Sequence, residues 1–592
     1  MAKNATRQDE EQGSKKKSET LIRLFSYLLE YKMTIVLVLL MMAVTTVITL
    51  VDPLLIEYAI DKSIASKDFV GLITVLSVAV VLNVIMVILI RVRMYVMAKV
   101  SNDVLVKIRK QLYAHIQTLS FDFFDSRPTG KILARVMGDV SALKDVISNT
   151  VTILIPDAVT IIAVVAIMLA KNLRLGLAAL WTLPLMIGGV LFVQSMAHKG
   201  WQVFYKKNSN LNAFIHEDVA GIKIIQSFNA EKETCETFDT LTKEHYEAYV
   251  RSVKFGDAFG PVVDICWAGG TIMMFFVGVK LTASGNLTVG TLIAFASYIA
   301  LFWQPVFNLS NYYNQLVTNI SRAERVFEIL DTPPDIYDKE GAYELPKIKG
   351  EVTFDKVSFG YEDDDEVLND VSFVAKPGQT IALVGATGAG KTTIVSLVAR
   401  FYDVDSGRIL IDGNDIRDVT LNSLRRQLGI MTQDNFLFTG TVRDNIRYGR
   451  LDATDEEIIA AAKAVNAHEF IMKMEKGYDT EIKERGAGLS AGERQLIAFA
   501  RTMVSDPGIL ILDEATSSID THTELLVQDG IEVLLRNRTS FVIAHRLSTI
   551  QKADRIFVID DGGIKEQGTA EELLTLKGEY YKLYKAQFGF VS

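Results

Sequence analysis

The chain has 592 residues, of which 49% are hydrophobic, and its formal net charge is −9 at pH 7. It is too long for one domain and too apolar for an ordinary water-soluble protein, so we expect part of it to lie in a lipid bilayer. The negative net charge provides no overall attraction for nucleic acid, so we expect no nucleic-acid partner. Its two cysteines, Cys235 and Cys266, cannot form a disulfide framework and have no metal-ligand spacing.

Residues 1–20 have no apolar segment of the kind found in cleaved signals, so they are predicted to form a polar cytoplasmic tail. Residues 21–330 are predicted to form a transmembrane domain, because they contain six apolar runs long enough to cross a bilayer. These runs cover residues 34–56, 71–90, 150–170, 175–193, 259–281 and 289–317. The second and third runs, and the fourth and fifth, are separated by long mixed-polar stretches that are predicted to extend the helices into water. Basic residues in the tail and in the first stretch place both in the cytoplasm.

Acidic residues inside apolar runs are candidates for function, because burying a charge in lipid is costly. Asp157, Asp257 and Asp264 are such residues, although Asp257 also fits an interfacial position. The sixth run has a polar and aromatic face, which fits a substrate path and fits equally well hydrogen bonding between helices. The residues assigned to a candidate substrate path are Asp264, Trp303, Phe307, Asn308 and Asn311.

A soluble domain is predicted to follow the membrane domain. Residues 331–349 contain two adjacent prolines and several charges and are predicted to form a linker, after which residues 350–592 form the second domain. The short runs TIALVG, RILIDG and GILILDE alternate there with helical patterns. This alternation predicts an α/β sheet whose strands are buried and continuously apolar.

The segment GATGAGKT, residues 385–392, fits a phosphate-binding loop, and a strand pattern precedes it while a helix pattern follows. Glycines let backbone N–H groups close around phosphate oxygens, and the helix N-terminus adds positive potential. Lys391 is predicted to reach the outer phosphates, and Thr392 to provide a ligand for Mg²⁺. The residues predicted to bind the nucleoside triphosphate here are Gly385, Gly388, Gly390, Lys391, Thr392 and Thr393.

Four polar residues follow other apolar, strand-like segments. Asp513 and Glu514 end one such segment, and their two carboxylates suit transfer of a phosphoryl group to water: one acid holds Mg²⁺ and the other orients the attacking water. Gln433 and His545 follow two further segments, so both are candidates for the same crevice. Gln433 is also a candidate ligand of Mg²⁺.

These motifs, in this order, resemble the nucleotide-binding domain of ATP-binding cassette (ABC) proteins over residues 350–592. The resemblance implies an ATP-stacking role for Tyr361 and assigns residues 385–392 to Walker A and Asp513 and Glu514 to Walker B. It also implies a Q-loop, a D-loop and a switch histidine, which are Gln433, Asp520 and His545 respectively. Six spans ahead of such a domain resemble a half-transporter of the exporter type. In the same family, FDFFDSRPTGKILARV resembles a coupling-helix segment and KERG resembles the X-loop.

The family resemblance implies a dimer in which two ATP molecules lie between the Walker motifs of one chain and the signature segment of the other. Closing this sandwich would convert an inward-facing cavity into an outward-facing one, and hydrolysis would reset it. The implied catalytic residues are Glu514, His545 and Gln433, and the implied cofactors are ATP and Mg²⁺. Ser490, Gly492, Glu493 and Asp520 would meet the ATP of the partner chain.

The signature segment departs from the family pattern Leu-Ser-Gly-Gly-Gln, because this chain has Ala491 and Glu493 in it. Ala491 adds a methyl group, and Glu493 adds a negative charge beside phosphate. Ser490 and Glu493 also have the spacing of a capping box, which predicts that Glu493 folds back onto the Ser490 N–H. Because the segment acts on the partner's ATP, a heterodimer with one hydrolytic and one degenerate site is favoured, and a homodimer is the alternative.

The resemblance implies an exporter of amphipathic drugs, peptides or lipids. An importer built on the exporter fold and a membrane-tethered regulatory ATPase are the alternatives. The layout suits a multi-pass protein of a bacterial plasma (inner) membrane, with the N-terminus and the ATP-binding domain in the cytoplasm. The sequence does not identify the transported substrate.

Overall fold

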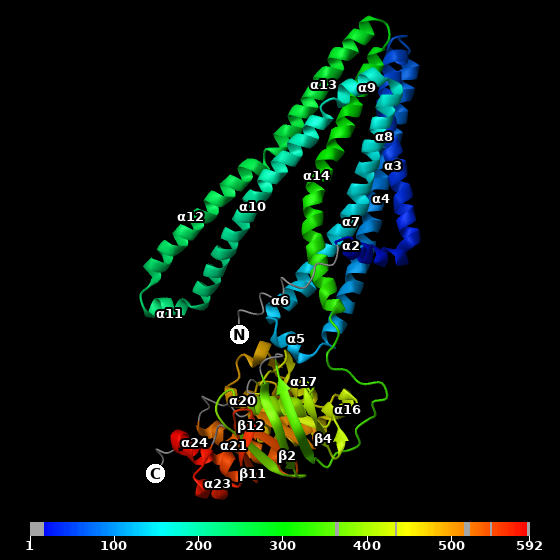
Figure 1. Ribbon diagram of the computed structural model, residues 1–592. Helices are drawn as coiled ribbons and strands as arrows, with labels where there is room; N and C mark the ends of the chain where they lie inside the picture. The colour runs from blue at the N-terminus through cyan, green and yellow to red at the C-terminus, as the bar shows by residue number, and fades with distance from the viewer. Residues whose placement is uncertain (1–16, 362–365, 433–434, 514–520, 545–546, 589–592) are drawn as a thin grey trace. The chain divides into compact units, whose positions relative to one another are not determined.

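The structure is a computed structural model of the whole chain. It describes all residues except 1–16, 362–365, 433–434, 514–520, 545–546 and 589–592 (Figure 1). The chain divides into two compact units. The first, here the membrane unit, is Met1–Gln117 with Pro128–Thr332, and the second, here the nucleotide-binding unit, is Thr118–Arg127 with Pro333–Ser592.

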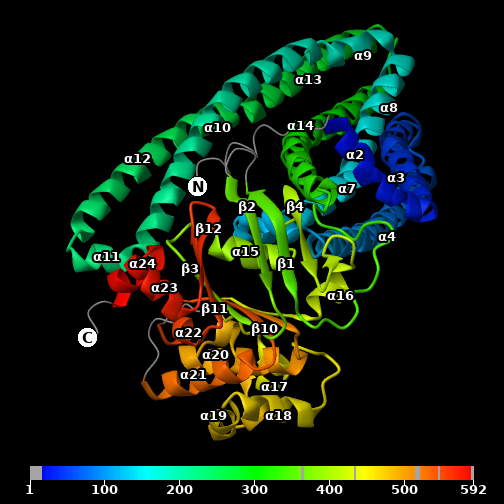
Figure 2. The same ribbon diagram turned by 60° about the horizontal axis from the view of Figure 1, so that its bottom comes forward.

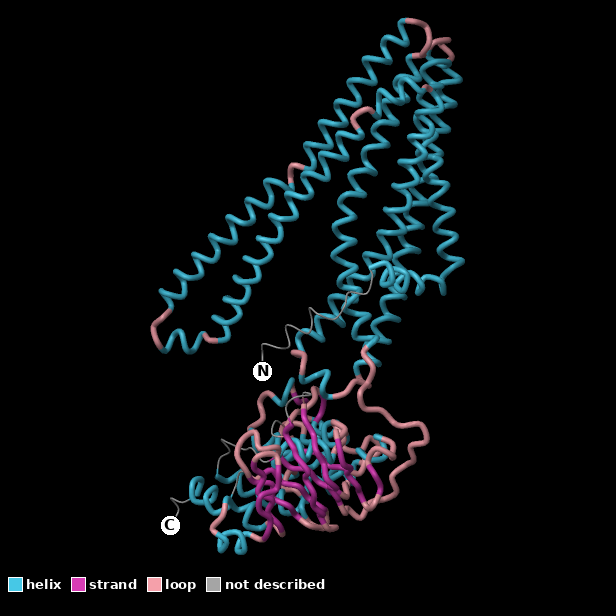
Figure 3. The backbone as a smooth tube through the Cα atoms, in the orientation of Figure 1, coloured by secondary structure: helices cyan, strands magenta, loops and turns pink. Residues whose placement is uncertain are grey.

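The membrane unit is helical throughout its described part (Figure 3). It contains six helical segments that are long and apolar enough to cross a membrane, as the sequence predicts. These segments are Glu19–Ile64, Phe69–Ile116, Thr129–Lys171, Leu173–Ala220, Glu231–Ala283 and Val289–Leu309. Between the second and third apolar runs, and between the fourth and fifth, the helices continue well beyond the runs, so the predicted helical extensions are confirmed, while their position in water stays a prediction.

The helices of the membrane unit are joined by short turns, some of them π-helical. In chain order they are α2 (Lys17–Ser26), α3 (Lys32–Tyr58), α4 (Phe69–Ile116), α6 (Thr129–Ala134), α7 (Val140–Asn149), α8 (Ile155–Lys171), α9 (Leu173–Leu180), α10 (Leu183–Ala220), α11 (Ile222–Ser227), α12 (Glu231–Gly256), α13 (Phe259–Ala283) and α14 (Val289–Asp331). Three helices begin at side-chain caps, because Asp68, Asn172 and Thr288 each accept a hydrogen bond from a backbone N–H of the first turn.

Two groups of helices are visible in this unit. α14 packs against α3, α7 and α8, while α10 and α12 lie side by side over their lengths (Figures 1 and 2). A buried apolar cluster that includes Met274, Phe295 and Tyr298 joins α8, α9, α13 and α14. The bundle therefore has a packed interior at this level and is not a hollow ring of helices.

A six-stranded sheet forms the centre of the nucleotide-binding unit, with strand order β12-β11-β3-β10-β9-β6. All neighbouring pairs are parallel except β11 and β12. The strands are β3 (Thr380–Val384), β6 (Leu428–Met431), β9 (Ile509–Asp513), β10 (Thr539–Ile543), β11 (Arg555–Asp560) and β12 (Gly563–Gly568).

Both faces of this sheet are covered, which explains its continuously apolar strands. Alternate residues of β9, such as Leu510 and Ile511, belong to two separate buried clusters, one on each face. One cluster includes residues of α20 (Ala491–Ser505) and α21 (Thr521–Leu535), which lie together in Figure 2. The other includes residues of α15 (Lys391–Val398) and of a second sheet.

The second sheet is antiparallel and has the order β2-β1-β4-β5. Its strands are β1 (Val352–Gly360), β2 (Glu366–Ala375), β4 (Ser406–Ile411) and β5 (Asn414–Asp415). The run RILIDG forms β4 and pairs antiparallel with β1, so its assignment to the α/β sheet is wrong. A short apolar run does not specify its partner strand, and β4 is buried on one face only.

The remaining elements of the nucleotide-binding unit are short and lie around the two sheets. They are α5 (Phe121–Asp125), α16 (Leu421–Arg425), β7 (Gly440–Thr441), α17 (Val442–Arg447), α18 (Asp455–Ala464), α19 (His468–Lys473), β8 (Glu481–Ile482), α22 (Leu547–Lys552), α23 (Ala570–Leu576) and α24 (Glu579–Phe588). α5 belongs to this unit although its chain neighbours α4 and α6 belong to the other.

Candidate functional site

The predicted phosphate loop connects β3 to α15, as the sequence pattern requires. At two positions of this loop the backbone requires glycine. A Cβ on Gly385 would lie 2.1 Å from the carbonyl oxygen of Ile559, and Gly388 has a φ of +87°, which side-chain-bearing residues rarely adopt. The loop therefore has the compact backbone that lets N–H groups approach phosphate oxygens.

Lys391 is the first residue of α15, and its ammonium points back into the loop. The Nζ atom donates hydrogen bonds to the carbonyl oxygens of Gly385 and Ala386, at 2.9 and 2.7 Å. Burial lowers the pKa of Lys391, and the negative charge of nearby Asp513 opposes that shift. The structure thus brings together the predicted phosphate ligand Lys391 and the predicted Mg²⁺ ligand Asp513, while Thr392 is exposed beside them.

Asp513 is the last residue of β9, at the carboxyl end of a strand that lies between β10 and β6. Because β3, β6, β9 and β10 are parallel, their carboxyl ends share one edge of the sheet, where ligands of such sheets bind. The predicted residues Gln433, Glu514, Asp520 and His545 lie outside the described residues, so their positions stay predictions.

Tyr361 lies close to the phosphate loop and is 44% exposed. Its hydroxyl is 3.1 Å from the Thr393 Oγ1 atom, with which it shares a hydrogen bond. Its ring meets Phe359 and Tyr402 edge-on, with centroids 5.0 and 5.2 Å apart. An accessible aromatic ring held by such neighbours is suited to stacking on a base.

The signature segment leads into α20, and the capping box predicted there is confirmed. Ser490 N donates to Glu493 Oε2 at 2.8 Å, and Glu493 N donates to Ser490 Oγ at 3.2 Å. Gly492 is buried within the first turn, and Arg494 donates to the carbonyl of Leu489 at 2.7 Å. The Glu493 carboxylate is therefore fixed at the start of the helix.

The first part of the segment that resembles a coupling helix, residues 121–127, belongs to the nucleotide-binding unit and packs within it. The Phe121 ring lies 4.2 Å from the Phe401 ring, between centroids, and Tyr402 donates a hydrogen bond to the Asp125 carboxylate. Burial, followed by this bond, raises the pKa of Tyr402. Since the Tyr402 ring also touches Tyr361, one residue connects the candidate adenine platform to this segment.

Sequence reasoning did not find Tyr402 or Asp125 as functional residues. Tyr402 lies in an irregular stretch after α15, and Asp125 is separated from it by 277 positions. No spacing or motif in the sequence connects two residues so far apart. Only the fold reveals that they meet.

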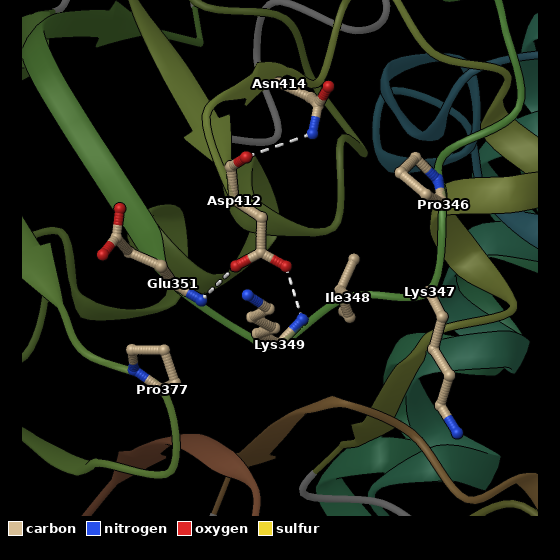
Figure 4. A pocket seen from close by; sticks show the side chains of 8 residues that line it. All are labelled: Pro346, Lys347, Ile348, Lys349, Glu351, Pro377, Asp412 and Asn414. Carbon is tan, nitrogen blue, oxygen red and sulfur yellow. Dashed lines mark hydrogen bonds between the residues drawn. The ribbon is translucent and has the colours of Figure 1, made fainter.

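A pocket at the start of the nucleotide-binding unit contains none of the predicted site residues (Figure 4). Asp412 uses its carboxylate internally: it accepts hydrogen bonds from the N–H groups of Lys349, Gly350 and Glu351. The pocket is lined by Pro346, Lys347, Ile348, Lys349, Glu351, Pro377, Asp412 and Asn414. Its hydrogen bonds fix the entry of the chain into β1, which is a structural role.

Two known protein families match this chain. Residues 35–306 match the family of the ABC transporter transmembrane region, and residues 368–517 match the ABC transporter family. The chain belongs to the ABC transporter family.

Individual relatives align with this ABC transporter over most of its length. The ABC transporter ATP-binding protein YknV of Bacillus subtilis is 41% identical, over 96% of this chain and 94% of its own. An ATP-dependent lipid A-core flippase of Syntrophus aciditrophicus is 40% identical, over 83% of this chain and 82% of its own. The solved structure of a bacterial Atm1-family ABC exporter with ATP bound has a TM-score of 0.79 at 30% identity, covering 95% of this chain and 99% of that one.

The ABC transporter thus has the exporter-type fold expected from its sequence, with one membrane domain and one ATP-binding domain in each chain. It is an ATP hydrolase coupled to transport. ABC exporters work as dimers and act on substrates across a lipid bilayer, so a second subunit completes the molecule.

The candidate substrate-path residues of the ABC transporter have different environments. Trp303 is only 6% exposed and packs on Phe302 in the buried cluster, which favours a structural role for it. Phe307 is 37% exposed, with its ring centroid 5.5 Å from that of Phe259, and Asp264 is exposed. The side chain of Asn311 is outside the described part of the chain.

Replacing Tyr402 with phenylalanine tests its link between Tyr361 and the coupling segment. The variant keeps the ring beside Tyr361 and loses only the hydroxyl that binds Asp125. We expect the affinity for ATP to be retained, whereas ATP-driven dye uptake into inside-out vesicles, per ATP hydrolysed, falls about threefold to tenfold, the value of one hydrogen bond. The exposed Tyr337, changed to phenylalanine, is the control. Equal uptake per ATP in Tyr402→Phe and Tyr337→Phe would contradict the link.

Proposed function

We propose that this ABC transporter is one subunit of a heterodimeric, ATP-driven exporter of amphipathic drugs, peptides or lipids in a bacterial plasma membrane. Its N-terminus and nucleotide-binding unit lie in the cytoplasm. Binding of ATP drives the two nucleotide-binding units together, which turns the substrate path outward. ATP achieves this by binding the closed dimer more tightly than the open one.

In this proposal the chain's own site hydrolyses ATP. Gly385, Gly388, Gly390, Lys391 and Thr393 hold the phosphates, and Tyr361 stacks on the adenine. Glu514 orients the attacking water, with His545 and Gln433 beside it. Thr392, Gln433 and Asp513 would hold Mg²⁺, which neutralises charge on the transferred phosphoryl group. The electrostatic interaction of Asp513 with Lys391 supports this donor set, because it indicates an ammonium and a carboxylate near the same phosphate loop.

The capping box at Ser490 and Glu493 is the observation that supports a heterodimer. It holds the Glu493 carboxylate at the start of the helix. In this proposal that carboxylate faces the partner's ATP, and so does Asp520. A negative charge there repels phosphate, whereas a neutral glutamine would donate a hydrogen bond. This chain thus offers a weakened signature to its partner while its own Walker residues are complete. A partner with an intact signature and weaker Walker B chemistry gives one hydrolytic site and one site that mainly holds ATP.

Purification of the chain alone and with its partner tests this asymmetry. We expect low ATPase activity from the isolated chain, and about a fivefold or greater rise when a second half-transporter, identified by mass spectrometry of the co-purified complex, is present. Glu514→Gln in the complex should abolish ATP-driven uptake of a labelled amphiphile into inside-out vesicles. Vigorous turnover by the isolated chain as a homodimer would refute the heterodimer. ATPase activity without uptake across a broad panel of amphiphiles would refute export.

A further inference from the structure

The charges inside the predicted membrane spans are mostly negative. Within the six apolar runs the charged side chains are Asp52, Asp157, Asp264 and Lys280, and Asp257 lies two residues before the fifth run. Lys280 is the next-to-last residue of its run, where a long side chain has the membrane surface within reach, and its ammonium lies 4.1 Å from the centre of the Phe276 ring, one turn away. The spans therefore present acids and no deep base to a molecule that crosses between them.

Among these acids, Asp157 lies deepest. It is about 21 Å along the helix from Lys171 and about 10 Å from Thr150, the other end of its apolar run, at 1.5 Å per residue. Both distances place it inside a hydrocarbon layer of about 30 Å. Asp52 and Asp264 lie closer to the ends of their runs.

The partners of the acids also differ. Asp52 accepts hydrogen bonds from the Asn83 amide at 3.4 and 3.5 Å, so its carboxylate has a hydrogen-bond partner within the fold. Asp157 has Asn308 of α14 within hydrogen-bonding reach, but its Oδ2 atom is buried and has no hydrogen-bond partner. The Asn308 carbonyl already accepts from Gln304 at 3.2 Å, so the amide N–H₂ group remains for Asp157. A buried carboxylate oxygen without a partner is costly, which calls for a functional reason.

A metal ion does not fit this position. The described residues contain no group of three or more metal-binding side chains, and a hard cation such as Ca²⁺ requires six to eight oxygen ligands. One carboxylate beside one amide suits a single positive charge on an organic molecule. Phe307, next to Asn308 in α14, packs with Phe259 of α13 and offers aromatic surface for an apolar body.

We propose that Asp157, supported by Asn308, recognises the positive charge of the transported molecule, so that the substrates are amphipathic cations rather than anionic lipids. This inference rests on the proposed export function and narrows its substrate class. Asn308 holds the carboxylate in place between α8 and α14. The substrate's cationic group then supplies the missing partner of Oδ2, while an anionic headgroup at the same depth is repelled.

Two probes of opposite charge test the proposal: ethidium, a permanent organic cation, and nitrobenzoxadiazole-labelled phosphatidylglycerol, an anionic lipid. The full chain, with the subunit that co-purifies with it, is measured for ATP-driven uptake of each probe into inside-out vesicles. We expect uptake of ethidium, and an increase of about tenfold or more in its KM in Asp157→Asn, the value of a lost charged hydrogen bond. Asp157→Glu, which restores the charge, should recover most of the wild-type KM and so separates recognition from folding.

Asp52→Asn is the matched control, because it removes another membrane-embedded carboxylate that already has a partner. Its KM for ethidium should stay at the wild-type value. A KM for ethidium in Asp157→Asn equal to that of the wild type overturns the inference. Uptake of the anionic lipid alone also overturns it but leaves the export function standing, as does uptake of neither probe when other amphiphiles of the broad panel are taken up; ATP hydrolysis without uptake of any of them overturns both.

Discussion

Lys391→Ala is expected to weaken ATP binding at this chain's own site about a hundredfold. The ammonium is held within the phosphate loop by the carbonyls of Gly385 and Ala386, so it is already placed to turn onto phosphate oxygens. A charged hydrogen bond to an anion contributes about 1.5–3 kcal/mol, and the upper value corresponds to about a hundredfold in affinity. Photolabelling of this chain by 8-azido-ATP over a range of concentrations measures the effect.

Lys463→Ala is a suitable control for this experiment, since Lys463 is an exposed lysine of α18 in the same unit. Its half-labelling concentration should match that of the wild type. If Lys391→Ala labelled at the same concentration as Lys463→Ala, the assignment of residues 385–392 to the phosphate site would fail. A general loss of folding would instead reduce the amount of purified complex.

Glu493→Gln is expected to tighten ATP binding at the partner's site about tenfold, by removing a negative charge next to phosphate. Glutamine also serves at the third position of a capping box, so the start of α20 should be preserved. Binding is measured in a complex that also contains Lys391→Ala, in which the remaining high-affinity nucleotide reports the partner's site. Unchanged affinity would show that the acid does not limit that site.

The chain provides a matched control in a second capping box. Thr569 and Glu572 make the same pair of hydrogen bonds at the start of α23. Glu572→Gln changes charge in the same helical position, outside the signature segment, and should leave ATP binding as it was. Glu493→Ala adds the complementary measurement, because it removes the charge and the hydrogen bond from Ser490 N while the Ser490 hydroxyl still caps the helix.

Features encoded by neighbouring residues were predictable from the sequence. The six spans follow from uninterrupted apolar runs, the phosphate loop from its glycines and flanking patterns, and the capping box from a three-residue spacing. In each case the physical cause lies within one continuous stretch of chain. These are also the features that fixed the fold class and the membership in the family.

Features that depend on distant partners were not predictable. β4 pairs with β1 in a separate sheet because of contacts between strands, which its apolar pattern does not contain. Trp303 is on the aromatic face of the sixth run, yet the neighbouring helices bury it. Tyr402 and Asp125 meet only once both sheets and the coupling segment are in place. Pairing of this kind is a property of the whole fold.

The coupling segment has a consequence for how the chain is made. Asp125 leaves the ribosome 277 residues before its partner Tyr402, which at 5–20 residues per second is an interval on the order of tens of seconds. During that time the rest of the membrane unit is synthesised while the apolar ring of Phe121 has no Phe401 to cover it. A piece of the nucleotide-binding unit is therefore made early, inside the membrane half of the sequence, and stays without its packing partners until the second half of the chain is synthesised.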